Sequence, residues 1–154
     1  MRNVFEKFNV KIEDRVFECD PETELKLDEV TINDDLKDQP SWYAWYASLQ
    51  ERAEAEYQMA KFALEITEAE TDARIRITSE KKPTEAQLKA MIVLDEDCQK
   101  ARLAVIEAKK IVGILRAVKE AFQHRKECAI ALASNMRAQA DPEIFIKKEK
   151  YDSQ

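Results

Sequence analysis

Glycine is almost missing from this chain, which has one glycine and four prolines in 154 residues. Tight turns and phosphate-binding loops depend on glycine, because it adopts backbone conformations that other residues avoid. The shortage argues against a fold of strands and turns and favours an all-α fold. It also leaves no material for a glycine-rich nucleotide-binding loop.

Cysteine and histidine are scarce too, with three cysteines and one histidine. Cys19, Cys98 and Cys128 lack the spacing of metal ligands, and we interpret them as small apolar residues in a reducing compartment. His124 has no companion of the kind that catalysis or metal binding requires. The chain has no HExxH motif and no nucleophile at a recognisable spacing from a base. We therefore expect no enzymatic activity, no metal and no cofactor.

Long apolar runs are absent as well. A membrane-spanning helix needs about 18 or more consecutive apolar residues, and no such stretch occurs. The first ten residues, MRNVFEKFNV, are charged throughout and do not resemble a secretory signal. We expect a cytoplasmic protein with no membrane partner.

Charge is plentiful but unevenly distributed. The net charge is −6, and residues 1–40 hold 6 basic and 12 acidic side chains, whereas residues 84–140 hold 10 basic and 7 acidic ones. We interpret residues 1–37 as an acidic N-terminal arm. Short strands at Val10–Ile12, Leu25–Leu27 and Val30–Ile32 remain the alternative.

Residues 84–140 have the pattern of one long helix. Apolar positions recur there by steps of three or four with a mean of 3.5, which is typical of a coiled-coil seam. Thr84 and Gln87 form a capping-box pattern at the start, and Asp141-Pro142 ends the helix. We interpret Gly113 as a place where another helix approaches closely. The seam positions are Leu94, Cys98, Ala101, Val105, Ala108, Val112, Leu115, Val118, Phe122, Arg125, Ala129, Leu132 and Met136.

A first long helix is expected over residues 38–78, with two apolar stripes on opposite sides. The first stripe comprises Tyr46, Leu49, Ala53, Tyr57, Ala60, Leu64, Thr67, Thr71 and Ile75. The second comprises Met59, Phe62, Ile66, Ala69, Ala73 and Ile77. One stripe can pack on the helix over 84–140, so the other needs a separate partner, which we expect to be another copy of the chain.

The fold that follows is a long two-helix antiparallel hairpin over residues 38–140, coiled-coil-like, with a C-terminal tail over 141–154. Aromatic residues cluster where the first helix begins, at Trp42, Tyr43, Trp45 and Tyr46. They could stack on single-stranded bases, but we favour packing at the end of a helical bundle.

The turn between the helices is basic. Arg74, Arg76, Lys81 and Lys82 lie near it, and Lys89 lies one turn into the next helix. Such a cluster can neutralise phosphates and bind DNA without regard to sequence. A solvated turn with ordinary surface charges is the equally weighted alternative.

A second basic row runs along the helix over 84–140, and it includes Arg116, Lys119 and Lys126. It could line a DNA-binding groove, although a solvated helix side is the commoner meaning. Arg125 lies within the apolar seam, where a guanidinium needs a carboxylate, a carbonyl or a phosphate as its partner. We include it among the candidate DNA-binding residues.

The order of these features resembles phage and prophage recombination mediators of the UvsY type. The resemblance rests on the acidic leader, the segment QP-SWYAWY, a first helix ending in DARIR, the restart KKPTEAQL, and the segments AFQHR and NMR in the last helix. Arg74 fits the DNA-contact position of the family's Lys-Ala-Arg-Leu element, although Asp72 stands where a lysine is expected. Arg125 and Arg137 match arginines of the family's last helix.

The resemblance implies small helical subunits that form a closed homo-oligomer, a ring or barrel, and bind single-stranded DNA. It implies that the protein displaces a single-strand-binding protein and loads a RecA-type recombinase in the cytoplasm of a bacterial host. The rival hypothesis is a coiled-coil structural or virion-assembly protein whose charges only keep it in solution. Salt-dependent binding of single-stranded DNA would separate the two hypotheses.

Overall fold

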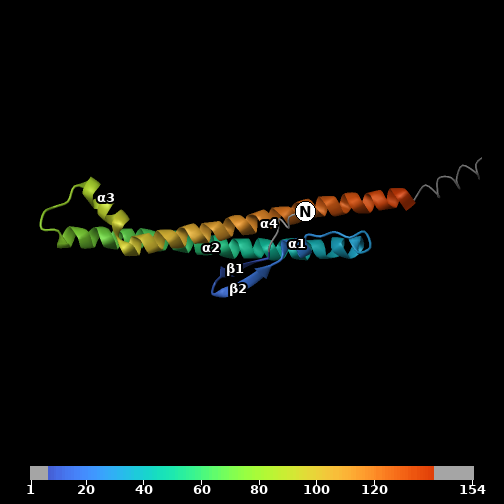
Figure 1. Ribbon diagram of the computed structural model, residues 1–154, viewed down its shortest axis with the longest axis horizontal. Helices are drawn as coiled ribbons and strands as arrows, with labels where there is room; N and C mark the ends of the chain where they lie inside the picture. Colours follow the sequence, from blue (N-terminus) through green and yellow to red (C-terminus); the bar gives the residue numbers. More distant parts are fainter. Residues whose placement is uncertain (1–6, 141–154) are drawn as a thin grey trace, which may run out of the picture. The chain divides into compact units, whose positions relative to one another are not determined.

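The computed structural model describes residues 7–140, and this part of the chain is mostly helical (Figure 1). The elements are, in order, the strands β1 (Phe8–Ile12) and β2 (Arg15–Cys19) and the helices α1 (Pro21–Glu24), α2 (Ile32–Thr78), α3 (Glu85–Leu94) and α4 (Glu96–Ala140). The expected tail over 141–154 and the expected helix end at Asp141-Pro142 lie outside the described residues. The described chain forms two compact units, each with parts of α2 and α4. Unit 1 comprises residues 7–8, 18–47 and 117–140, and unit 2 comprises residues 9–17 and 48–116.

The two long helices pack against each other as an antiparallel pair within each unit, so the two-helix hairpin is confirmed. In unit 1, Asp35 bonds to Arg125 while Gln39, four residues further along α2, bonds to Phe122. In unit 2, Glu68 of α2 bonds to Arg102 of α4 at 2.6 Å. The numbering on one helix rises as that on the other falls, which defines the antiparallel arrangement.

The predicted seams form the interior of the helical pairs. The second-helix positions from Val112 to Ala129 that we assigned to the seam are all buried, and so is Cys98. On α2, the first stripe is buried at both its ends, with Tyr46 and Leu49 at one end and Ile75 at the other. Leu94 is the exception, because 73% of its surface is exposed.

Leu94 is exposed because the helix that we expected to be continuous over 84–140 is interrupted at Asp95. The backbone of Asp95 is extended, with ψ at 130°, and its N–H donates to the carbonyl of Ile92 at 3.3 Å, which ends α3. Its carboxylate then accepts the backbone N–H groups of Asp97 and Cys98, both at 3.1 Å, and so caps the start of α4. The expected capping box of Thr84 and Gln87 is present at the start of α3.

Helix α2 begins at Ile32 and not at residue 38. The carbonyl of Thr31 accepts the N–H groups of Asp34 and Asp35, both at 2.9 Å, and the two aspartates lie in the first turn. Negative side chains are favourable there because the amino end of a helix carries partial positive charge. Residues that we assigned to the acidic arm therefore form the start of the helix, and Pro40 lies inside it.

The remaining part of the expected arm is also folded within the described residues. Val10–Ile12 lies in β1, as the strand alternative proposed, and β1 pairs with β2 in a two-stranded sheet. The turn between the strands uses Glu13 and Asp14, both with positive φ, and the N–H of Glu13 donates to the carboxylate of Glu56 on α2. Leu25–Leu27 and Val30–Ile32 are not strands.

Two small residues depart from their expected roles. An added Cβ at Gly113 would meet no atom within 4 Å, so no other helix of residues 7–140 approaches it closely. Cys128 is exposed and does not fill the core, whereas Cys19 and Cys98 are buried as expected.

Candidate nucleic-acid interface

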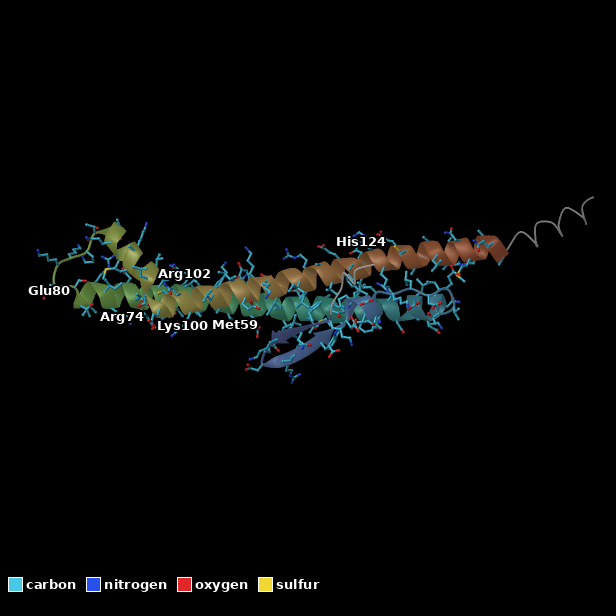
Figure 2. The ribbon with its side chains drawn as sticks, in the orientation of Figure 1. Met59, Arg74, Glu80, Lys100, Arg102 and His124 are labelled. Atoms are coloured by element: carbon cyan, nitrogen blue, oxygen red, sulfur yellow. The ribbon has the colours of Figure 1, made fainter. Side chains whose placement is uncertain are left out.

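Unit 2 contains the basic turn, which spans residues 79–84 between α2 and α3. Figure 2 labels Arg74 near the end of α2 and Glu80 in the turn. All five cations that we assigned to this surface are exposed and belong to unit 2. They are Arg74, Arg76, Lys81, Lys82 and Lys89.

The two arginines at the end of α2, just before the turn, are bound by carboxylates. Arg76 donates from Nε to Asp72, at 3.0 Å from Oδ1, and from Nη2 to Glu85, at 3.2 Å from Oε1. The hydrogen bonds that Arg76 donates to Glu85 and Asp72 raise its pKa above the ordinary value. Arg74 forms an ion pair with Asp95, the residue that separates α3 from α4. Both arginines therefore hold the turn together, and their charge is largely neutralised locally.

Asp72 has a role that the comparison with the Lys-Ala-Arg-Leu element did not reveal. It pairs with Arg76 across one helical turn, at a spacing of four residues. That spacing was a usable signal in the sequence, because opposite charges four residues apart face each other on a helix.

The three lysines in and after the turn are different. Within residues 7–140, the ammonium groups of Lys81, Lys82 and Lys89 form no ion pair. Lys81 and Lys82 precede α3, whose first amide groups add partial positive charge on the same side. Pro83 restricts the backbone of Lys82 before it, and the capping box of Thr84 and Gln87 fixes the start of α3 just after the two lysines. These lysines are the cations best able to meet a phosphate.

The second basic row does not extend the turn. Arg116 lies in unit 2, while Lys119 and Lys126 lie in unit 1. None of the three forms an ion pair within the part of the chain that the structure describes, and Lys119 is half-buried. Lys126 lines a small cavity of about 350 Å³ together with Tyr43 and Gln123.

Arg125 belongs to the core and not to a DNA-binding surface. Only 6% of its surface is exposed. Its Nη2 donates to Asp35 Oδ1 at 2.7 Å and to the carbonyl of Lys26 at 3.1 Å, while Nη1 donates to Gln39 Oε1 at 2.8 Å. The carboxylate and carbonyl partners that the sequence required are thus supplied by unit 1 itself, so our assignment of Arg125 to DNA contact is corrected.

The aromatic cluster divides into a packed half and an exposed half. Trp42 and Tyr46 both stack on Phe122, with ring centroids 5.8 and 5.2 Å away. The packing that we favoured over base stacking is confirmed for these two rings. Burial and a hydrogen bond to Glu24 raise the pKa of the Tyr46 hydroxyl far above its ordinary value, so it stays protonated. Tyr43 and Trp45 keep 38% and 48% of their surface exposed.

A second surface of unit 2 is apolar. We call it the exposed α2 face, and it is the second stripe of the sequence. Met59 and Phe62 have 61% and 64% of their surface exposed, Ile66 has 43% and Ile77 has 84%. Met59 also borders a groove of about 590 Å³ beside β1, which sequence reasoning missed because it depends on where β1 packs. The face comprises Met59, Phe62, Ile66, Ala69, Ala73 and Ile77.

The described residues show no cluster of three or more histidine, cysteine, aspartate or glutamate side chains placed to hold a metal ion. Over residues 7–140, every helix is too short or too polar to cross a membrane. Neither protein-family models, nor curated proteins, nor solved structures give a match to this chain.

Proposed function

We propose that this chain is a recombination mediator that binds single-stranded DNA and helps to load a RecA-type recombinase in phage recombination and repair. The observation that carries the proposal is the pair Lys81 and Lys82. Both are exposed on the turn just before the capped start of α3, and neither is neutralised by a carboxylate of the described chain. Cations of this kind release counterions from a phosphate backbone, which drives binding that is independent of sequence.

One turn with two or three free lysines binds a strand weakly, so the proposal includes self-assembly into a ring or barrel. The exposed α2 face supports this part, because apolar side chains of this size arranged in a row mark surfaces that bind another protein. Several turns acting on one strand would raise the affinity by avidity, without any further contact within a subunit. In the cell, the same surfaces would work beside a single-strand-binding protein, which the mediator displaces.

The direct test is a titration of a fluorescent single-stranded oligonucleotide at several salt concentrations. For single strands, the logarithm of the binding constant falls with the logarithm of salt concentration by about 0.7 per phosphate neutralised. K81A/K82A should reduce that slope by about 1.4 for each subunit in contact with the strand, with helicity unchanged. K37A/K61A is the matched control, because Lys37 and Lys61 are exposed lysines outside the turn. An equal slope in K81A/K82A and in the unmodified protein would reject the turn as the DNA-binding surface.

A structural or virion-assembly protein is the second candidate. It is favoured by the ion pairs of Arg74 and Arg76 with carboxylates, because these pairs give both arginines a structural role that does not require DNA. Between Asp72 and Asp95, five cations stand against four carboxylates, so the local excess of positive charge is small. This candidate requires that the oligonucleotide titration show no binding at low salt.

A further inference from the structure

The exposed α2 face has a size pattern that specifies its occupant. Its large side chains, Met59, Phe62 and Ile66, come first along the helix, and two alanines, Ala69 and Ala73, follow them. Ile77 then ends the face with 84% of its surface exposed, and Ala55, also exposed, lies at the other end on the same side of α2. Between the two ends, the face therefore has large side chains in its first half and small ones in its second half. At the ends the order is reversed, with a small residue, Ala55, before the large ones and a large residue, Ile77, after the small ones.

Such a face is complementary to itself when two copies run in opposite directions with Ile66 at the centre. Residues equally far before and after Ile66 then stand at the same height, because each residue of a helix rises by a constant amount. Met59 and Ala73 each lie seven residues from Ile66, so they meet across the pair. Phe62 lies four residues before Ile66 and Ala69 three residues after it, so these two stand within about 1.5 Å of the same height.

The ends of the face fit the same register. Ala55 and Ile77 each lie eleven residues from Ile66, so the last large side chain also meets an alanine. Large side chains opposite small ones fill the space between two helices without voids or overlap. A parallel pair in register would instead set Phe62 against Phe62 and Ala73 against Ala73, which crowds one end and leaves a gap at the other.

We propose that a second copy of this chain binds the exposed α2 face as an antiparallel helix pair with a two-fold axis at Ile66. This inference rests on the self-assembly part of the proposed function and names one of its contacts; a two-fold contact closes as a dimer, so a ring or barrel needs a second interface between such dimers. The contact is isologous, meaning that both copies use the same patch. It also sets the basic turns apart: Lys81 lies fifteen residues from the axis, so the two turns stand about 45 Å from each other along the pair.

Cysteine cross-linking tests both the surface and the direction. In a C128S background, which removes the exposed native thiol, M59C and A73C proteins are oxidised separately and as a mixture. In the antiparallel pair, residue 59 of one copy faces residue 73 of the other, whereas two copies of residue 59 lie about 21 Å apart along the axis. Disulfides need Cβ atoms about 4 Å apart. We therefore expect a disulfide-linked dimer from the mixture and essentially none from either protein alone.

Two results would overturn the pairing. If M59C alone cross-links as fast as the mixture, the helices run parallel. If neither the separate proteins nor the mixture cross-links although the native mass shows an oligomer, another surface joins the copies. Neither result involves DNA, so a negative oligonucleotide titration rejects the mediator while the pairing stands, and a failed cross-link with DNA binding intact rejects only the pairing.

Discussion

Arg125 shows how a single charged residue in an apolar seam can decide the local structure. Its guanidinium joins three segments of unit 1, namely the chain before α2 at Lys26, the start of α2 at Asp35 and Gln39, and α4 itself. The sequence identified the position as unusual and named the kinds of partner it needs. It could not name Asp35, because the choice among many acidic residues depends on where α2 begins.

We expect Arg125→Ala to lower the free energy of unfolding of the protein by about 3 kcal/mol, because removal of one partner leaves the other charge of a buried pair uncompensated. Urea denaturation followed by circular dichroism measures the change. Arg137→Ala is the control, since Arg137 is an exposed arginine of the same helix and should shift stability by at most about 0.5 kcal/mol. Equal urea midpoints for Arg125→Ala and Arg137→Ala would contradict a structural role for Arg125.

Substitution of Gly113 is expected to change the free energy of unfolding in the opposite direction. Nothing lies within 4 Å of the position that a Cβ would take, so alanine fits without strain. Alanine is better than glycine in a helix interior by about 1 kcal/mol. We expect Gly113→Ala to raise the free energy of unfolding by about that amount in urea denaturation. A loss of stability, or a smaller native mass for the variant, would mean that the glycine accommodates a helix of another copy.

At the scale of elements, the helices followed from periodicity, whereas the places where the chain changes direction did not. The β-hairpin turn is Glu13-Asp14, without the glycine or asparagine that usually marks a turn with positive φ. A bond from the Glu13 N–H to Glu56 holds it, and no local pattern reveals a contact so distant in sequence. The break at Asp95 had a local signal, since an aspartate followed by Glu96 and Asp97 is typical of a helix start. The continuous apolar seam concealed it.

Asp95 makes the junction of α3 and α4 sensitive to acid. The hydrogen bond from the Cys98 N–H, together with Arg74, holds the pKa of this carboxyl below its ordinary value. A group whose folded-state pKa is depressed stabilises the fold above its unfolded pKa, near pH 4, and loses that contribution as pH falls through the lower folded-state value. We expect Asp95→Asn, which keeps a capping side chain but cannot titrate, to lose less thermal stability than the unmodified protein when the pH is lowered below about 4.

The measurement is the melting temperature by circular dichroism, followed from neutral pH down into this acidic range. Asp95→Ala is the companion variant, because it removes the cap at every pH and should melt a few degrees lower even at neutral pH. The same acid-induced loss in Asp95→Asn and in the unmodified protein would show that other carboxylates control the acid response.

At the scale of the whole molecule, the sequence located an apolar face that the described residues 7–140 leave exposed. The alternation of two stripes on α2 was enough to predict it, because both stripes keep helical spacing on opposite sides. The basic turn was placed correctly near the end of α2, but the neutralisation of its arginines could not be predicted, since Asp95 reaches Arg74 only because α4 begins there. Unit 2 thus carries both the basic turn and the exposed α2 face. The proposed function depends on the coupling of the two, because assembly through the face would bring several turns to one strand.

That coupling predicts an effect on DNA binding from residues that carry no positive charge. F62E/I66E places two carboxylates on the exposed α2 face, so two copies that pair through it would repel each other. Both side chains are exposed, and the fold of a subunit should survive. If assembly brings several basic turns to one strand, the variant should bind a long single-stranded oligonucleotide at least about 100-fold more weakly, because avidity contributes factors of this size. Fluorescence anisotropy measures the affinity, and analytical ultracentrifugation measures the mass. Val30→Glu is the control, since Val30 is an exposed apolar residue of unit 1.

A variant that sediments as a monomer yet binds the strand as tightly as the unmodified protein would separate assembly from DNA binding. The turn of one subunit would then suffice for binding.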